Sequence, residues 1–281
     1  MDELMSRDRP FPAGSYNIDL LQNSRAEVAR LERRAQLRLA GFPTLLQRHG
    51  FPSLGRVLEI GCGQGLRTQI MAELAPNADI TGVDRNGQLL HAARANTRRN
   101  CENLFYQQHD LYALPFPDAS VDFVYARLVF MHLEAPLTAL REMSRLLKPG
   151  GRILIEDADR DCMFFEPAPT TFVEYWRAVQ EGQRRRGGDP NVGRKLASYL
   201  KGEGFTDLNI EAQPIVGDGA DIAFLISELL TTLNEYLDDK DRSLGEAALS
   251  DLGQLAQDPR ATFFHFWFAV SGAKTSENEK R

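Results

Sequence analysis

Residues 57–65, VLEIGCGQG, decide the fold because they join an apolar run to a turn that holds three glycines. Gly61, Gly63 and Gly65 have no Cβ, so the backbone here can adopt left-handed angles or approach a bound molecule more closely than a side chain would allow. The apolar run before the turn is typical of a buried strand, and residues 66–74 after it have helical spacing. Such a strand, turn and helix indicate a cradle for a cofactor at the carboxyl end of the strand.

Short runs rich in branched and aromatic residues alternate with stretches of helical spacing. Strand followed by helix, repeated several times, predicts a parallel sheet with right-handed crossovers and helices on both faces. We therefore expect an α/β fold with a doubly wound, mostly parallel sheet. The runs that predict strands are residues 56–61, 79–84, 104–110, 121–127, 152–159, 206–216 and 262–272, and the first predicted helices are 66–74, 88–100 and 136–147.

We expect three regions along the chain. Residues 1–50 form a helical N-terminal lid segment, residues 51–272 the sheet domain with helical insertions near 162–191 and 221–258, and residues 273–281 a polar tail. Within the lid, residues 24–47 have the pattern of one long amphipathic helix, with Ser24 as its cap and a glutamate three positions on. Its exposed part could pair with a second copy, giving a possible homodimer.

Composition excludes several classes of protein. The 281 residues carry a formal net charge of −6, which argues against a nucleic-acid partner, since phosphate binding needs a concentrated basic surface. Three cysteines without CxxC spacing predict no disulfide framework and no metal site, and they favour a reducing, cytoplasmic location. The densest apolar run, residues 263–270, is far shorter than the roughly 20 residues that a bilayer requires, so no membrane span is expected.

The spacing of the glycines separates the candidate cofactors. A dinucleotide fold places glycines as GxGxxG, and the position of its third glycine is Leu66 here, while no phosphate-binding GxxxxGK[ST] motif occurs. Asp84 ends the second predicted strand, where a carboxylate accepts hydrogen bonds from the two hydroxyls of a ribose. Asp84 alone is compatible with either kind of nucleotide fold.

Five sequence motifs occur in the chain in the order that is typical of one enzyme family. Over residues 16–272 it resembles the class I S-adenosylmethionine-dependent methyltransferases, in particular the branch that methylates small molecules. The resemblance implies a Rossmann-like, seven-stranded sheet whose last strand is antiparallel, with S-adenosyl-L-methionine as the cofactor. The five motifs are residues 59–65, Asp84, residues 107–127, residues 132–151, and residues 193–205 with the apolar strand after them.

The same resemblance assigns roles to individual residues. The glycine turn with Glu59 would hold the methionine part of the cofactor, Asp84 the ribose, and Asp110 with the amide of Leu111 the adenine edge. Arg127 would offer its carbonyl to the methionine amino group. The residues that the resemblance places in the cofactor site are Tyr16, Glu59, Gly61, Gly63, Gly65, Asp84, Arg85, Asp110, Leu111 and Arg127.

Methyl transfer is an in-line displacement on the sulfonium, and geometry dominates it. Holding the reactants in a near-attack pose contributes roughly 7–11 kcal/mol, whereas a general base adds about 10² to 10⁴-fold in rate. Asp157 and Asp159, at the carboxyl edge of the fifth strand, could orient or deprotonate a polar acceptor, or could simply form an acidic turn. His132, just after the fourth strand, is a candidate base or a packed histidine. Arg127 argues against a magnesium-dependent mechanism, since its charge would repel a divalent ion.

Three classes of function remain compatible with the sequence. The first is methyl transfer to oxygen, nitrogen or carbon of a small-molecule acceptor, the second is methyl transfer to protein or RNA, and the third is a cofactor-binding protein without transfer activity. An Asn- or Asp-Pro-Pro-Tyr type motif after the fourth strand would signal an amide or base nitrogen. Residues 126–131 read ARLVFM instead, which favours the small-molecule acceptor.

Overall fold

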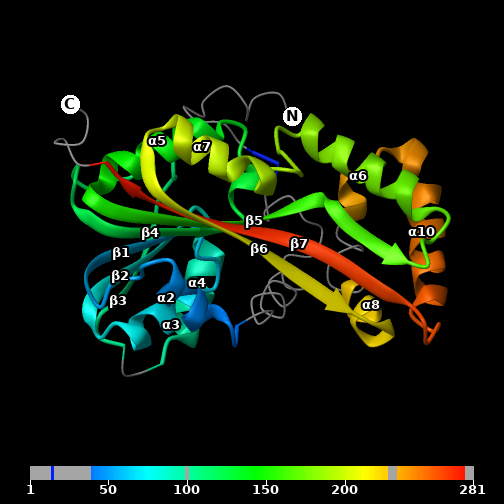
Figure 1. Cartoon of the computed structure of the whole chain (residues 1–281), viewed down its shortest axis with the longest axis horizontal. Coiled ribbons are helices and arrows are strands. Elements are labelled where there is room, and N and C mark those ends of the chain that lie inside the picture. The colour runs from blue at the N-terminus through cyan, green and yellow to red at the C-terminus, as the bar shows by residue number, and fades with distance from the viewer. Residues whose placement is uncertain (1–13, 16–38, 99–100, 227–232, 276–281) are drawn as a thin grey trace.

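A seven-stranded sheet forms the centre of the molecule in the computed structural model, which describes residues 14–15, 39–98, 101–226 and 233–275. The strand order is β3-β2-β1-β4-β5-β7-β6 (Figure 1). Strands β1 to β5 pair in parallel, and β7 runs antiparallel to both β5 and β6, which confirms the predicted α/β class and its antiparallel last strand. The strands are β1 Leu54–Ile60, β2 Asn77–Asp84, β3 Leu104–Gln108, β4 Val121–Arg127, β5 Leu147–Glu166, β6 Phe205–Gly217 and β7 Thr262–Lys274.

Helices cover both faces of the sheet. Figure 1 shows α2, α3 and α4 on one face and α5 and α7 on the other. Alternation within β1 explains the two layers, because Val57 packs into the core under α2 and α3 while Leu58 packs into the core under α5 and α7. The helices are α2 Phe42–Arg48, α3 Leu66–Leu74, α4 Gly87–Asn96, α5 Pro136–Leu146, α6 Phe172–Arg185, α7 Leu196–Gly202, α8 Gly219–Leu225 and α10 Arg242–Leu255, with short 3-10 turns η2 Phe130–His132, η3 Gly193–Lys195, η5 Asn234–Tyr236 and η6 Asp239–Asp241.

Three strands run well past the rest of the sheet. β5 has 20 residues and β6 and β7 have 13 each, and their far ends carry a separate hydrophobic core with α6, α8 and α10 around it (Figure 1). The helical insertion predicted near 162–191 therefore begins as strand, since residues 163–166 pair with residues 262–265 of β7. The reason is a period of two: Met163 and Phe165 are buried, while Phe164 between them is half exposed.

The prediction of one helix over residues 24–47 is wrong at its described end. Residues 39–41 form a turn, and α2 begins afresh at Phe42 with Gly41 as its N-cap. Pro43 explains the break, because proline is tolerated in the first turn of a helix and not in its interior. Ser24 and the rest of that predicted helix lie outside the described residues. The division of the chain into three regions stays a prediction, although α2 packs in the core of the sheet domain.

Helical elements fill the described part of the insertion expected near residues 221–258. α8 spans Gly219–Leu225, and residues 234–236 form the 3-10 turn η5. Asp218 starts α8 in a capping box with Asp221. Among the helices that the structure describes, none has the length and apolar character needed to span a bilayer.

Candidate functional site

The glycine turn after β1 is fixed to the end of the neighbouring strand. The amides of Gly61 and Cys62 both donate to the carbonyl of Val83 in β2, at 2.8 and 3.1 Å. Gly61, Gly63 and Gly65 all have left-handed backbone angles, with φ of 69°, 55° and 74°. An added Cβ at Gly61 would lie 2.5 Å from the side chain of Val129, whereas one at Gly63 would meet nothing within 4 Å. The middle glycine therefore borders open space that a cofactor can occupy.

Asp84 ends β2 and is tied to the same turn. One carboxylate oxygen accepts from the Gly63 amide and the other from the Asn86 amide, each at 2.9 Å. Burial raises the pKa of Asp84, and these two amides oppose the shift. Each oxygen has two lone pairs and uses one on the backbone, so both oxygens can accept a further hydrogen bond from a ribose diol.

Glu59 lies in β1 just before the turn and is buried. Its carboxylate accepts a hydrogen bond from the Thr68 hydroxyl at 2.6 Å, so β1 and the first turn of α3 are joined. Burial raises the pKa of Glu59 to about 7, with Thr68, Arg67 and Arg127 acting in the opposite direction. The carboxyl group is therefore poised between its two charge states near neutral pH.

The structure brings the predicted adenine residues to the edge next to Asp84. The amide of His109 donates to the carbonyl of Asp84 at 3.2 Å, which places the residues after β3 beside the end of β2. Asp110 is exposed there, and its carboxylate accepts from the Tyr112 amide at 2.9 Å, with Leu111 half-buried between them. The carbonyl of Arg85 accepts from the Gln108 side chain at 2.9 Å.

Arg127 ends β4 opposite Glu156 of β5. Its guanidinium lies over the ring of Trp267 with 4.6 Å to the ring centroid, and the next residue, Leu128, has a left-handed φ of 55°. The glycine turn follows β1, and β4 is the neighbour of β1 in the sheet. Arg127 therefore lies at the same edge of the sheet as Gly63. Tyr16, the remaining predicted cofactor residue, lies outside the described residues.

Asp157 is fully buried one residue past Glu156. Its carboxylate accepts from the backbone amide of Met131 at 3.1 Å and from that of Ala158 at 2.9 Å. Burial raises the pKa of Asp157 to about 7, and the amide donors and Arg127 act in the opposite direction. An acid with this pKa can change protonation state during a reaction at neutral pH.

The other two predicted catalytic residues have partners within the chain. Asp159 is fully buried and binds the guanidinium of Arg194 with both oxygens, one of them 2.6 Å from Nη2. Nδ1 of His132 lies 3.0 Å from the hydroxyl of Ser15, whose amide donates to the carbonyl of His132 at 2.9 Å. Asp157 differs from both, because its carboxylate accepts hydrogen bonds from backbone amides.

Sequence reasoning missed three contributors to this region. Thr68 lies nine positions after Glu59, and nothing in its surroundings signals the bond between them. Arg194 falls in the GRK stretch that resembles the family, where an acid partner 35 positions earlier could not be read from the sequence. Arg160 interrupts an acidic run, so it reads as a residue paired with its neighbours. Within the described part of the chain, no group of three or more His, Cys, Asp or Glu side chains is placed to hold a metal ion.

Comparison with known proteins supports the family that the sequence resembles. The family model described as a methyltransferase domain matches residues 58–155. An uncharacterized methyltransferase of Schizosaccharomyces pombe is 28% identical over 229 residues, which is 74% of this chain and 81% of that protein. A malonyl-[acyl-carrier protein] O-methyltransferase of Paenibacillus sp. is 27% identical over 185 residues, 63% of this chain and 59% of that enzyme. Together with the fold, these matches support a class I S-adenosylmethionine-dependent methyltransferase.

A solved structure shares the fold of this methyltransferase. The Haemonchus contortus phosphoethanolamine N-methyltransferase 2, in complex with S-adenosyl-L-methionine, superposes with a TM-score of 0.62 at 20% identity, covering 95% of this chain and 62% of that one. S-adenosylmethionine is the cofactor of the methyltransferase described here. The open space beside Gly63 and the paired acceptors of Asp84 fit the methionine and ribose parts of that cofactor.

Proposed function

We propose that this methyltransferase transfers the methyl group of S-adenosylmethionine to an oxygen, nitrogen or carbon atom of a small-molecule acceptor. The observation that carries the proposal is the set of buried polar groups beside β5, just past the end of its pairing with β4 and next to α6. Asp157 and Gln183 are fully buried there, and Gln183 of α6 donates to the carbonyl of Met131 at 2.8 Å. Groups this deeply buried suit an acceptor small enough to be enclosed, which favours a small molecule over a folded protein or an RNA strand.

For the cofactor we assign three contacts to the described residues. The glycine turn would bind the methionine part, with Gly63 next to the ligand. Asp84 would accept from the ribose hydroxyls, since both its oxygens face the same edge of the sheet as the turn. Asp110 would accept from the adenine amine while the Leu111 amide donates to the ring.

The catalytic work of the chain is mainly positioning. When bound, S-adenosylmethionine supplies a sulfonium methyl group that an acceptor lone pair attacks from the side opposite sulfur. Asp157 would orient a polar acceptor and take its proton, because its carboxylate is held by two amides and titrates near neutral pH. His132 and Asp159 would position the surrounding loops, through Ser15 and Arg194 respectively.

Labelled cofactor tests the proposal directly. We expect the purified chain to release S-adenosylhomocysteine with a metabolite extract below the size of a protein, and not with protein or RNA fractions. Asp84→Asn should abolish release at low cofactor concentration. Release with protein or RNA alone would move the acceptor to that class, and tight cofactor binding without release in any fraction would leave a binding protein.

A further inference from the structure

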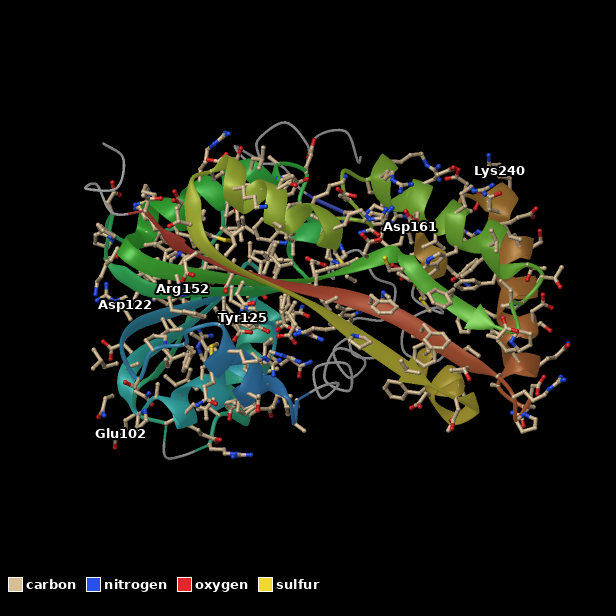
Figure 2. The ribbon with its side chains drawn as sticks, viewed as in Figure 1. Glu102, Asp122, Tyr125, Arg152, Asp161 and Lys240 are labelled. Atoms are coloured by element: carbon tan, nitrogen blue, oxygen red, sulfur yellow. The ribbon has the colours of Figure 1, made fainter. Side chains whose placement is uncertain are left out.

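Arg160 is a buried arginine with aromatic rings around it and one donor unpaired. It belongs to β5 where this strand passes under α6, and it is 5% exposed. Its backbone is fixed on both sides: the amide donates to the carbonyl of Pro190 at 3.1 Å, and the carbonyl accepts from the indole nitrogen of Trp176 at 2.6 Å. Asp161, the next residue, lies at this bend of β5 beneath α6 in Figure 2. The two backbone hydrogen bonds therefore fix the position of Arg160 in β5, and its side chain is buried there.

Aromatic rings surround the guanidinium of Arg160. The ring centroid of Trp176 is 5.4 Å from its central carbon and that of Tyr236 is 5.8 Å away. The faces of these rings attract the flat cation by cation–π interaction. They do not accept hydrogen bonds from the N–H groups, which point outward in the plane of the guanidinium. Trp176 in turn stacks on Phe172, and Tyr236 donates its hydroxyl to the carbonyl of Ser15, so both rings are fixed in place.

One buried donor of the Arg160 guanidinium has no acceptor in the part of the chain that the structure describes. Its Nη1 atom is shielded from solvent and has no hydrogen-bond partner, and the side chain forms no ion pair with a described carboxylate. Burial lowers the pKa of Arg160 to about 10, so the side chain stays positively charged at neutral pH. A buried charge without a counter-charge is strongly unfavourable, and proteins keep one where a ligand completes the pair.

The nearby acids are already committed to other donors. Asp157 accepts from two backbone amides, and Asp159 binds Arg194 with both oxygens. Asp161 is bound by Arg194 and by Asn191, and Asp189 by Lys195. Asp157 acts on Arg160 only through its charge, and none of these acids forms a salt bridge with the guanidinium.

We propose that Arg160 binds an oxyanion of the methyl acceptor, either a carboxylate or a phosphate group, so that the acceptor of this enzyme is an organic acid or phosphate ester. The inference rests on the proposed function, because it specifies the substrate class of that same site. A planar guanidinium held by its faces presents its edge, and an edge of parallel N–H donors matches two oxygens of such an anion. The anion would sit at Arg160 while Asp157, three residues back on β5, faces the reacting end of the same molecule.

Binding without turnover tests the oxyanion site. The protein, saturated with S-adenosylhomocysteine, is titrated with benzoate, succinate and phenyl phosphate and with the neutral benzamide and succinamide, and the fluorescence of Trp176 reports occupancy beside Arg160. We expect the acids to bind at least about tenfold more tightly than the amides, and Arg160→Met to remove that preference. A stronger response to benzoate than to phenyl phosphate, or the reverse, identifies which of the two anions the site takes.

Two controls separate a ligand role from a structural one. Arg186 stacks on the same Tyr236 ring at 5.1 Å but is exposed, so Arg186→Gln should leave the acid preference unchanged. Arg160→Met removes an unpaired buried charge, so we expect the ligand-free variant to unfold at the same temperature as the wild type or at a higher one. The proposal is overturned if acids and amides bind alike, if no acid binds, or if Arg160→Met keeps the preference for acids. Failure of the proposed function would look different: S-adenosylhomocysteine would be released with protein or RNA only.

Discussion

The backbone amide of Gly63 donates to the carboxylate of Asp84 across 2.9 Å, so the turn after β1 and the end of β2 form one unit. The bond aligns the two parts of the site that must hold different ends of one cofactor, the methionine moiety and the ribose. It also explains why Asp84 can be largely buried, because backbone donors offset part of the cost of removing its charge from water.

Asp84→Asn should weaken binding of S-adenosylhomocysteine by roughly 10 to 100-fold, since a charge-assisted hydrogen bond to each ribose hydroxyl contributes about 1.5–3 kcal/mol. Calorimetric titration measures the loss. Asp79→Asn is the matched control, because Asp79 lies on the same strand away from its carboxyl end and is exposed. Equal affinity of Asp84→Asn and wild type would remove Asp84 from the cofactor site.

Gly63→Ala and Gly65→Ala should separate ligand binding from packing. Both positions are left-handed, so alanine costs about 1–2 kcal/mol of folding free energy at either. At Gly65 the new Cβ would also collide with the ring of Tyr106, which adds roughly 1–3 kcal/mol. At Gly63 it would project into open space, so the main effect should be lower affinity for S-adenosylhomocysteine. Denaturant unfolding and calorimetry read the two effects, and a larger loss of stability in Gly63→Ala would contradict this division.

Glu59 should make the fold more stable in mild acid than in mild base. Burial raises its pKa from 4.5 to about 7, so the folded state holds the proton more tightly than the unfolded state does. The resulting stability is present below the unfolded pKa and is lost as the pH rises through 7, up to roughly 3 kcal/mol in total.

Glu59→Gln keeps an oxygen for the Thr68 hydroxyl and removes the titration. The variant should therefore gain stability over wild type between about pH 5 and about pH 8, as followed by urea unfolding at each pH. Glu73→Gln, an exposed change on α3, serves as the control and should show no such gain. A constant difference between Glu59→Gln and wild type across this range would show that Glu59 does not titrate there.

Asp157 should control the pH dependence of turnover. If it takes the acceptor proton, the rate must rise as the pH passes its pKa of about 7, because only the ionised form can accept a proton. Asp157→Asn should remove this increase of the rate with pH and slow turnover by about 10² to 10⁴-fold. Its affinity for S-adenosylhomocysteine should be unchanged. Initial rates over a pH series test it, and a variant with the wild-type rate and profile would exclude a chemical role.

The cofactor half of the site could be read from local sequence, and the acceptor half could not. The turn that holds Gly63, the helix over residues 66–74 and the placement of Asp84 follow from glycine chemistry and periodicity within some thirty residues. Strand ends that come next to each other in the sheet then meet at one edge by topology alone.

Beyond β5 the decisive contacts join distant segments. Arg160 meets Trp176 and Tyr236, and Asp159 meets Arg194, across separations of 16 to 76 positions. From the sequence EDADRD, Arg160 is expected to form ion pairs with the adjacent acids. Only the structure shows that its buried Nη1 atom has no hydrogen-bond partner. The extension of β5 to Glu166 was likewise hidden, because a short alternating run next to a helix gives little signal.

The pair of Asp159 and Arg194 allows a last prediction about which acid reacts. Asp159 is fully buried and Arg194 is 47% exposed, so Arg194→Gln leaves a buried carboxylate without its counter-charge. Stability should fall by roughly 1–3 kcal/mol, less than for a fully buried pair because water already screens the arginine. Asp159→Asn in the Arg194→Gln background removes the buried charge and should recover most of that loss. If Asp159 only positions η3 and β5, the double variant should also retain turnover within about tenfold, measured as S-adenosylhomocysteine release. Recovered stability with lost turnover would instead place the Asp159 carboxylate in the reaction.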